Sequence, residues 1–182
     1  MKILTTGIVK LEKDKFKNIT NDKECILNKP LSGGLWGSTY LENYLKDKSF
    51  PSSWYKFAIH SGLGKNIKDA VIYSLTNSAK IYELDSIEKY DYLKENYSTT
   101  NTCYKESISI DWEKLSKDYD AFHLSLDMFY ELRQFKYYRN MDFYSWDCES
   151  YLIFNFDCID QESIQYIQID NICIDEEDWD DD

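Results

Sequence analysis

Short apolar runs separated by polar clusters are the dominant pattern along this chain. Runs of this kind are typical of strands when they span about four to eight residues between turn-forming side chains. The strongest strand signals come from residues 151–156 and 164–169, which are rich in β-branched and aromatic residues. Weaker runs predict further strands at residues 2–9, 69–75, 79–84 and 119–126. Strands are therefore expected to gather toward the C-terminal half.

Helix signals fall between these runs. The pattern predicts helices at residues 52–60, 85–96 and 111–116, with mixed structure at 127–135. Ser52 fits the N-cap of the first helix, which should end before Gly62. Asp85 and Glu88 have the spacing of a capping box at the start of the second.

The composition is that of a folded protein. The chain has 182 residues, of which 43% are hydrophobic and 16% aromatic, enough to bury the core of one domain. Strands and helices are interleaved, without an internal repeat or a Pro/Gly-rich linker. We expect a mixed α+β fold: a single domain over residues 1–174, with mixed or antiparallel sheets and short flanking helices.

The net charge is strongly negative, and much of it is concentrated in the last eight residues. The formal net charge is −12, and residues 175–182 contain seven acidic side chains, which leaves −12 + 7 = −5 for the rest. Nonspecific nucleic-acid binding is therefore not expected, because the chain repels phosphate backbones. Residues 175–182 should form an acidic flexible tail, with docking onto a basic partner as the alternative.

Cysteine and histidine usage argues against a disulfide framework or a structural metal site. The five cysteines are widely spaced, no Cys-x-x-Cys occurs, and the chain has only two histidines. The N-terminal apolar run is too short for a signal sequence, and no stretch approaches the ~20 apolar residues of a membrane span. We expect a reduced cytoplasmic protein that does not enter a membrane.

An acidic pair, Asp147 and Glu149, stands just before the apolar run 151–156. In a chain with 33 acidic residues, such a pair is often only the solvated end of a strand. A carboxylate fixed at a strand end can also line a cleft and act on a ligand there. Both interpretations stay open from the pair alone.

Three of the six glycines, Gly33, Gly34 and Gly37, surround Trp36. This density predicts tight turns and a close approach of the backbone. The segment is weak as a phosphate loop, because it lacks a Gly-Lys-Ser/Thr ending. A plain turn before a strand is the simpler interpretation.

The order of these segments resembles the ADP-ribosyltransferases of the diphtheria-toxin and poly(ADP-ribose)-polymerase superfamily. Residues 4–7 resemble the family's aromatic-His/Arg-Gly element, and residues 34–38 its Gly-Ile-Tyr-Phe-Ala or Ser-Thr-Ser strand, with the helix at 53–55 following. Residues 119–121 resemble the Tyr-Asp-Ala strand, and 147–149 the Glu/Gln-x-Glu element. The chain departs from the pattern at two positions. Thr6 stands in place of His or Arg, and Asp147 in place of Glu or Gln.

The resemblance implies an NAD-dependent mono-ADP-ribosyltransferase that modifies a cellular macromolecule, with a protein target expected first. In this family one carboxylate grips the nicotinamide ribose and favours an oxocarbenium-like transition state. That role falls to Glu149, with Asp147 orienting the acceptor. Gly7 would hold the nicotinamide carboxamide through its backbone, while Trp36 walls the ring and Ser38 hydrogen-bonds in the same pocket. No metal is implied.

The resemblance also implies roles for three further residues. Thr6 would line a variant NAD pocket or one that no longer works. Tyr144 and Trp146 would form the aromatic part of a target-recognition loop.

Other candidate residues have simpler explanations. His123 lies within an expected strand, where a structural histidine is the favoured interpretation, and Cys148 lacks a nearby His to activate it. Arg133, Lys136 and Arg139 are spaced as a basic ridge, for an anionic ligand or for charge compensation. The alternative to an enzyme is an acidic inhibitor or immunity-type protein that occludes a basic surface.

Overall fold

The computed structural model describes residues 1–22, 28–47, 49–63, 67–100, 108–133, 143 and 145–169. Its main sheet contains β1 (Ile3–Thr6), β2 (Leu35–Thr39), β3 (Asp69–Tyr73), β4 (Ile81–Leu84), β7 (Ala121–Leu124), β8 (Ser150–Ile153) and β9 (Gln165–Gln168). The helices are α1 (Ser53–His60), α2 (Ile87–Tyr97), α3 (Trp112–Asp118) and α4 (Leu126–Arg133). A small second sheet joins β5 (Ser98–Thr100) to β6 (Ile108–Ile110), and the 3-10 turns are η1 (Lys13–Lys15), η3 (Phe156–Cys158) and η4 (Gln161–Ser163). The mixed α+β class is confirmed.

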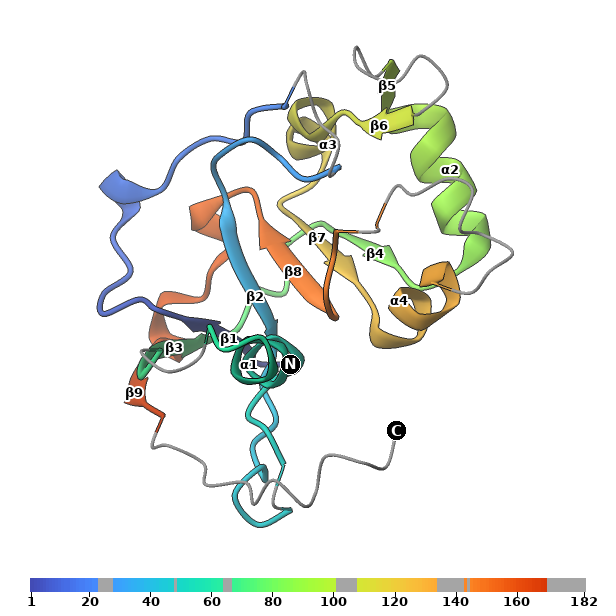
Figure 1. The fold of residues 1–182 in the computed structure, drawn as a ribbon. Helices are drawn as coiled ribbons and strands as arrows, with labels where there is room; N and C mark the ends of the chain where they lie inside the picture. Colours follow the sequence, from blue (N-terminus) through green and yellow to red (C-terminus); the bar gives the residue numbers. More distant parts are fainter. Residues whose placement is uncertain are drawn as a thin grey trace.

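The main sheet interleaves strands from distant parts of the chain. Its order is β4-β7-β8-β2-β1-β3-β9, and every neighbouring pair is antiparallel except β4 with β7 (Figure 1). The first strand, the Trp36 strand and the strand after Glu149 are thus adjacent, as expected for parts of one sheet. The expectation that strands gather in the C-terminal half is wrong, because β1 to β4 all precede residue 85.

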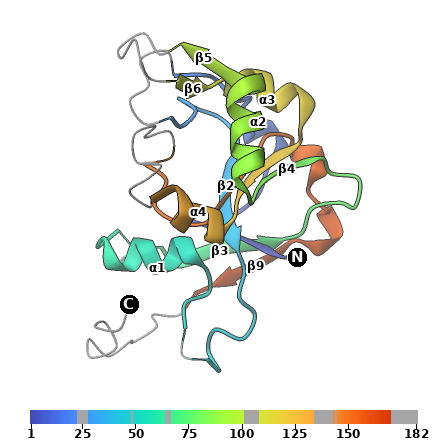
Figure 2. The ribbon, with the colours of Figure 1, turned by 90° about the vertical axis from the view of Figure 1, so that its right-hand side faces the viewer.

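All four helices pack on one face of this sheet. Side chains of β4, β7 and β8 on this face form a core with α2, α3 and α4, in which Trp112 and Leu93 are fully enclosed. Farther along the same face, Leu4 of β1 and Ile72 of β3 pack against Tyr55 of α1. Figure 2 shows α1 at the β3 end of the molecule, with α2 and α3 toward the opposite end. We call this side the helix face.

The opposite side is covered by loops. Its core contains Ile3, Leu35, Val71 and Tyr151, and the segments around Ile8 to Phe16 and after β8 pack over them. We call this side the loop face. Successive side chains of a strand point to opposite faces, so each strand residue belongs to one side or the other.

Local capping fixes the helix starts. Ser52 Oγ accepts the backbone N–H of Tyr55, which confirms the expected cap of α1, and Asp111 caps α3. The expected capping box placed the N-cap of α2 at Asp85, one residue before its position in the structure. The N-cap of α2 is Ser86, because its short hydroxyl reaches the N–H of Lys89, while Asp85 pairs with the Lys89 ammonium group instead.

Two elements differ from the expected pattern. Residues 126–133 form a regular helix rather than mixed structure, because Ser125 caps its first turn and Met128 and Phe129 are buried on one side. The run before residue 169 forms an edge strand, β9, with mostly exposed side chains. It is held by backbone pairing to β3 and not by a buried face.

Some expectations fall outside the described residues. These are the acidic tail at 175–182, Tyr144, Lys136, Arg139, Cys25, Cys103 and Cys173. Within the described part of the chain, none of the helices has the length and apolar character required to cross a membrane.

Candidate functional site

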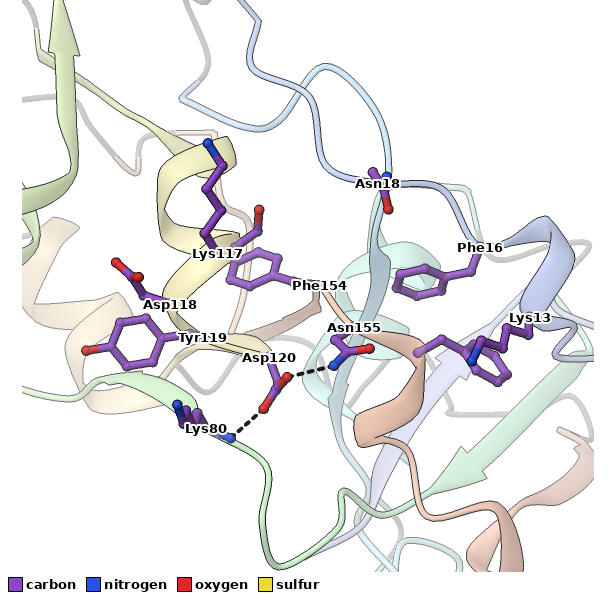
Figure 3. A pocket seen from close by; sticks show the side chains of 12 residues that line it. Lys13, Phe16, Asn18, Lys80, Lys117, Asp118, Tyr119, Asp120, Phe154 and Asn155 are labelled. Atoms are coloured by element: carbon purple, nitrogen blue, oxygen red, sulfur yellow. Dashed lines mark hydrogen bonds between the residues drawn. The ribbon is translucent and has the colours of Figure 1, made fainter.

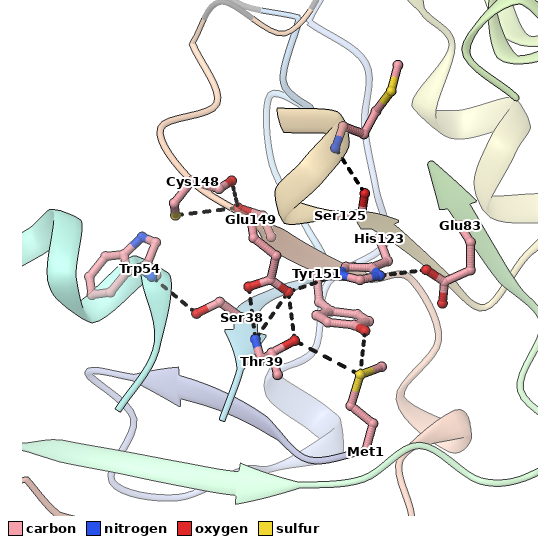
Figure 4. Close-up of polar contacts among 12 residues, drawn as sticks. Met1, Ser38, Thr39, Trp54, Glu83, His123, Ser125, Cys148, Glu149 and Tyr151 are labelled. Atoms are coloured by element: carbon pink, nitrogen blue, oxygen red, sulfur yellow. Dashed lines mark hydrogen bonds and ion pairs between the residues drawn. The ribbon is translucent and has the colours of Figure 1, made fainter. Parts of the chain in front are cut away.

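Glu149 is the most constrained charged residue of the described structure. Its side chain is only 5% exposed, although it carries a carboxylate. Thr39 of β2 donates to it twice, from the backbone N–H at 3.0 Å and from the hydroxyl at 2.9 Å. His123 of β7 lies 2.9 Å away through Nε2, and its Nδ1 lies 2.5 Å from Glu83 of β4 (Figure 4). Side chains from four neighbouring strands therefore meet in one cluster, in which Glu149 and His123 are buried and Glu83 is 35% exposed.

The surroundings of His123 act on its pKa in opposite directions. Burial by itself lowers the pKa of a histidine, but the hydrogen bonds and charges of Glu149 and Glu83 outweigh it. The net result is a pKa raised above the ordinary value of 6.5. The hydrogen bonds from Thr39 and the contact with His123 offset part of the cost of burying Glu149.

Two further side chains cover this cluster. Tyr151 stacks flat on the His123 ring, with ring centroids 3.8 Å apart and an interplanar angle of 6°. Its hydroxyl donates to Met1 Sδ at 3.2 Å, and the Thr39 hydroxyl lies 4.0 Å from the same sulfur. Met1 is 70% exposed, so solvent begins directly behind it. The Glu149 cluster is thus buried but lies only one side chain below the surface.

Asp147 does not join Glu149. It forms an ion pair with Lys29 at 3.6 Å, and its side chain is 37% exposed. Residues two apart in a strand point to the same side, but β8 begins only at Ser150, so this alternation does not extend back to Asp147. The two carboxylates contact different parts of the chain.

The candidate cofactor residues Trp36 and Ser38 lie on the helix face, away from Glu149. Trp36 packs on Trp146 with ring centroids 4.9 Å apart, within the core beneath α2 and α3. Ser38 is fully buried, and its hydroxyl accepts the backbone N–H of Trp54 at the start of α1. Thr39, one residue later, faces the other way and holds Glu149.

Thr6 and Gly7 lie at the far end of the sheet. The register pairs Leu4 with Ser38, so Gly7 is displaced from Thr39 by four residues, roughly 13 Å along the strands. The Gly7 N–H already donates to the Asp69 carbonyl at 2.7 Å. The expected pocket uniting Gly7, Trp36 and Glu149 is therefore not assembled, and the expected role of the Gly7 amide is corrected.

The glycines around Trp36 allow close packing, as their density in the sequence predicted. A Cβ on Gly33, whose φ is +92°, would lie 2.0 Å from the Asn18 carbonyl oxygen. A Cβ on Gly37 would lie 2.6 Å from the Ile3 side chain. Gly33 and Gly34 thus let the loop at residues 17–19 press against the start of β2.

Several other candidates have structural roles. Trp146 is 1% exposed, so it is a core residue and not part of an exposed recognition loop. Burial raises the pKa of the Cys148 thiol to about 12, which leaves it protonated and unreactive near neutral pH. Arg133 donates to the Trp146 carbonyl and stacks over Phe129. Among the described residues, no three His, Cys, Asp or Glu side chains form a group suited to a metal ion.

Sequence reasoning missed the partners of Glu149. His123 and Glu83 each alternate with apolar neighbours inside an expected strand, so a polar side chain on a buried strand was the available signal. Their meeting depends on the parallel pairing of β4 with β7, which pairs Glu83 with His123.

Comparison with protein-family models, with curated proteins and with solved structures finds no match to this chain.

Proposed function

We propose that this chain is an NAD-consuming mono-ADP-ribosyltransferase that modifies a protein target, with Glu149 as its essential carboxylate. The observation that carries the proposal is the contact between Thr39 and Glu149. It joins the Gly-Leu-Trp-Gly-Ser-Thr strand to the Asp-x-Glu element across 110 residues. These are the two segments with the most specific resemblance to the ADP-ribosyltransferases.

The hydrogen bonds around Glu149 suit the expected chemistry. In ADP-ribosyl transfer the bond between nicotinamide and ribose C1′ breaks, nicotinamide leaves with the bonding electrons, and an acceptor oxygen or nitrogen attacks C1′. Positive charge develops on the ribose, where a fixed anion stabilises it. The Thr39 donors and His123 hold this carboxylate in a fixed position.

The Thr39 hydroxyl offers a route for substrate contact. A ribose hydroxyl can replace it on Glu149 without loss of a hydrogen bond, because both groups are O–H donors. Met1 covers this hydroxyl from the solvent side and would have to move. The proposal therefore places the nicotinamide ribose on the loop face, beside Thr39 and Tyr151, and assigns no cofactor contact to Gly7, Trp36 or Ser38.

A cytoplasmic setting is part of the proposal. Cys148 and Cys158 are free thiols, which persist in a reducing compartment.

In the test, purified protein is incubated with NAD, and the nicotinamide that is released is measured by chromatography. We expect slow NAD hydrolysis by the parent, and a loss of ~10² to 10³ in turnover for Glu149→Gln, the usual effect of removing one preorganised transition-state contact. Asp147→Asn is the matched control, because Asp147 is nearby, acidic and absent from the cluster. It should hydrolyse NAD at the parent rate.

The outcome that contradicts the proposal is equal NAD consumption by the parent and a folded Glu149→Gln variant. Absence of both NAD binding and turnover in the parent would contradict it as well.

A second candidate, an acidic binding protein that occludes a basic surface, is favoured by the same cluster. All the hydrogen bonds of Glu149 are made within the protein, so its carboxylate can serve the fold alone. In that case Glu149→Gln lowers stability, while NAD has no effect on the melting temperature of either protein.

A further inference from the structure

A cavity opens at the end of β7 and β8 that lies opposite Glu149. Its volume is about 530 Å³, within the usual range of small-molecule sites. It lies between the loop at residues 13–18, the end of α3 and the turn after β8 (Figure 3). None of the candidate residues for ADP-ribosyl transfer lines it.

Strand β8 separates this cavity from the Glu149 cluster. Glu149 directly precedes the strand, whereas Asn155, in the cavity wall, follows its end. The two residues are six positions apart, which corresponds to roughly 20 Å along an extended chain. A ligand in the cavity would therefore be a different ligand from one bound at Glu149.

A fixed pair of polar side chains lies in the cavity wall. Asp120 accepts the backbone N–H of Lys80 on one carboxylate oxygen and the Asn155 side-chain amide, at 2.8 Å, on the other (Figure 3). The carbonyl oxygen of the same amide accepts the backbone N–H of Asp157 at 3.0 Å. The orientation of the amide group is thus set by a donor on one side and an acceptor on the other. Both side chains are held in place without a ligand.

This pair presents a donor and an acceptor side by side. The amide nitrogen of Asn155 donates one of its two hydrogens to Asp120, and the carboxylate oxygen that receives it has a second lone pair. Asn155 is exposed and Asp120 half-buried, so a ligand in the cavity can reach both. Neighbouring hydroxyl groups of a sugar ring match this arrangement. One hydroxyl can donate to the carboxylate while the next accepts from the amide.

Two aromatic rings lie beside the polar pair. Phe156 follows Asn155 in the chain and packs edge-on against Phe16, with ring centroids 5.7 Å apart. Both rings line the cavity and are half-buried. The face of an aromatic ring is negative, which suits the weakly positive C–H groups on the apolar face of a sugar ring.

The charged side chains of the wall have both signs. Two lysines, Lys80 and Lys117, share the wall with two carboxylates (Figure 3). The carboxylates are those of Asp118 and Asp120. An anion or a cation in the cavity would meet a like charge as well as an opposite one. A neutral ligand with many hydroxyl groups can instead use the donors and the acceptors together.

The glycine segment before β2 supports this wall. Gly34 N–H donates to the Lys17 carbonyl at 2.9 Å, and Gly33 approaches the backbone of Asn18. These contacts hold the loop that carries Phe16 against the start of β2. The glycine density in the sequence therefore has a role at the cavity.

We propose that this cavity binds a neutral sugar ring. The apolar face of the ring packs on Phe16 and Phe156. Two neighbouring hydroxyl groups bridge the Asp120 carboxylate and the Asn155 amide. The site takes no part in the proposed NAD chemistry and goes beyond that function.

Methyl β-D-glucopyranoside is the test probe, because it is neutral and has several pairs of neighbouring hydroxyl groups. Binding to the full chain is measured by amide chemical shifts, including those of the Asn155 side chain. We expect saturable binding with a Kd of about 1 mM, reasonable for a ligand with so few atoms. Cyclohexanol tests the apolar face alone, and glycerol tests the neighbouring hydroxyl groups alone. Each should bind at least about fivefold more weakly, the scale of one lost hydrogen bond or ring contact.

Two further ligands define the class. Phenol tests a planar aromatic ligand, and methyl glucuronide tests the same sugar ring with a negative charge. Neither should bind more tightly than the neutral glucoside. Methyl β-cellobioside distinguishes the end of a glycan, which would bind more tightly than one ring, from a free monosaccharide, for which the second ring adds nothing.

Variants assign the contacts. Asp120→Asn should weaken glucoside binding by about fivefold, because it removes an acceptor from the pair. Phe16→Leu should weaken it by about threefold, because leucine lacks the flat aromatic face. The double change Lys80→Met and Lys117→Met should leave it within about twofold, because a neutral ligand needs neither charge. Asp14→Asn is the control, an exposed acid of η1 outside the cavity wall that should change nothing.

Three results would overturn the proposal. The first is the absence of saturable glucoside binding by the parent, and the second is tighter binding of phenol or methyl glucuronide. The third is parent affinity in Phe16→Leu together with a loss in the double lysine variant. Phe16 lies in a loop outside the sheet, so this outcome can be read even if Asp120→Asn does not fold.

Discussion

The two ends of strands β7 and β8 each carry a carboxylate whose oxygens accept hydrogen bonds, but they differ in what surrounds it. At one end Glu149 is buried beside His123, which also contacts Glu83, and side chains close over it. At the other end Asp120 is held by a backbone N–H and an amide beside an open cavity. The first arrangement depends on charge, and the second on neutral hydrogen bonds.

Because of this difference, the Glu149 carboxylate matters more for stability, and the Asp120 end is more open to a ligand. A buried ion cluster is sensitive to the loss of any member, because the remaining charges stay desolvated. A half-exposed carboxylate with neutral donors loses only those bonds, since water can replace them. The comparison indicates that the Glu149 carboxylate is more sensitive than the Asp120 carboxylate to the loss of its charge, and that the cavity end is the more accessible to a ligand.

The largest effect is expected at the wall of the cavity. Gly33→Ala should cost about 3 kcal/mol or more, because it combines a positive φ with a clash against the Asn18 backbone. Gly7→Ala is the control, with a φ of +74° and open space around its Cβ, and should cost about 1 kcal/mol. Urea unfolding measures both. Equal losses of stability would show that the loop at residues 17–19 shifts to accommodate the added methyl group at little cost.

Removing one charge tests the Glu149 end. Glu149→Gln should cost about 2 to 3 kcal/mol, because it leaves His123 beside one acid and breaks charged hydrogen bonds. Asp120→Asn, the equivalent change at the other end, should cost about 1 kcal/mol. Denaturant midpoints for the two variants give the comparison directly. A larger loss for Asp120→Asn would reverse the order of the two ends.

A smaller effect is expected from pH. The pKa of His123 is raised in the folded protein, so its contribution to stability is present below the unfolded value of 6.5 and is lost as pH rises through the folded pKa. The stability difference between the parent and His123→Gln should therefore shrink as the pH rises above 6.5 and through the raised pKa of the folded protein. Thermal melts of both proteins across this range measure it. A difference that stays constant with pH would mean that His123 is neutral in the fold.

The smallest effect is expected at the tail. Deleting residues 175–182 should shift the melting temperature by less than about 5 °C, the scale of ~1 kcal/mol in a modest domain, because seven of the eight side chains are acidic and repel one another. A larger shift would show that the tail packs on the protein and contributes to its stability.

Local features of the fold could be read from the sequence. The caps at Ser52 and Asp111 act within one helical turn, and the strands at β3, β4 and β8 have apolar runs of their own. Such signals require only neighbouring residues. The helix α4 was missed because its buried face is only two residues, Met128 and Phe129.

The candidate site was predicted only in part, because side-chain direction depends on register. Glu149 was identified together with the strand that would face it, and the two do meet. Whether Trp36 or Thr39 faces Glu149 is decided by the pairing of Trp36 with Leu152, over 100 residues away in sequence. A slip of one residue would exchange the two faces, and no local pattern fixes it.

The order of the sheet also constrains how the chain can fold as it is synthesised. Strands β1, β2 and β3 pair within the first 73 residues and can associate early. One edge of β2 then has no partner until β8 emerges, since Thr39 and Glu149 are 110 residues apart. Pairing at such separation is slow, because a long loop must close before any contact forms. During that interval the exposed β2 edge is open to intermolecular pairing, as is the outer edge of β3 until β9 emerges. Translation speed and chaperone supply should therefore influence the yield of native protein.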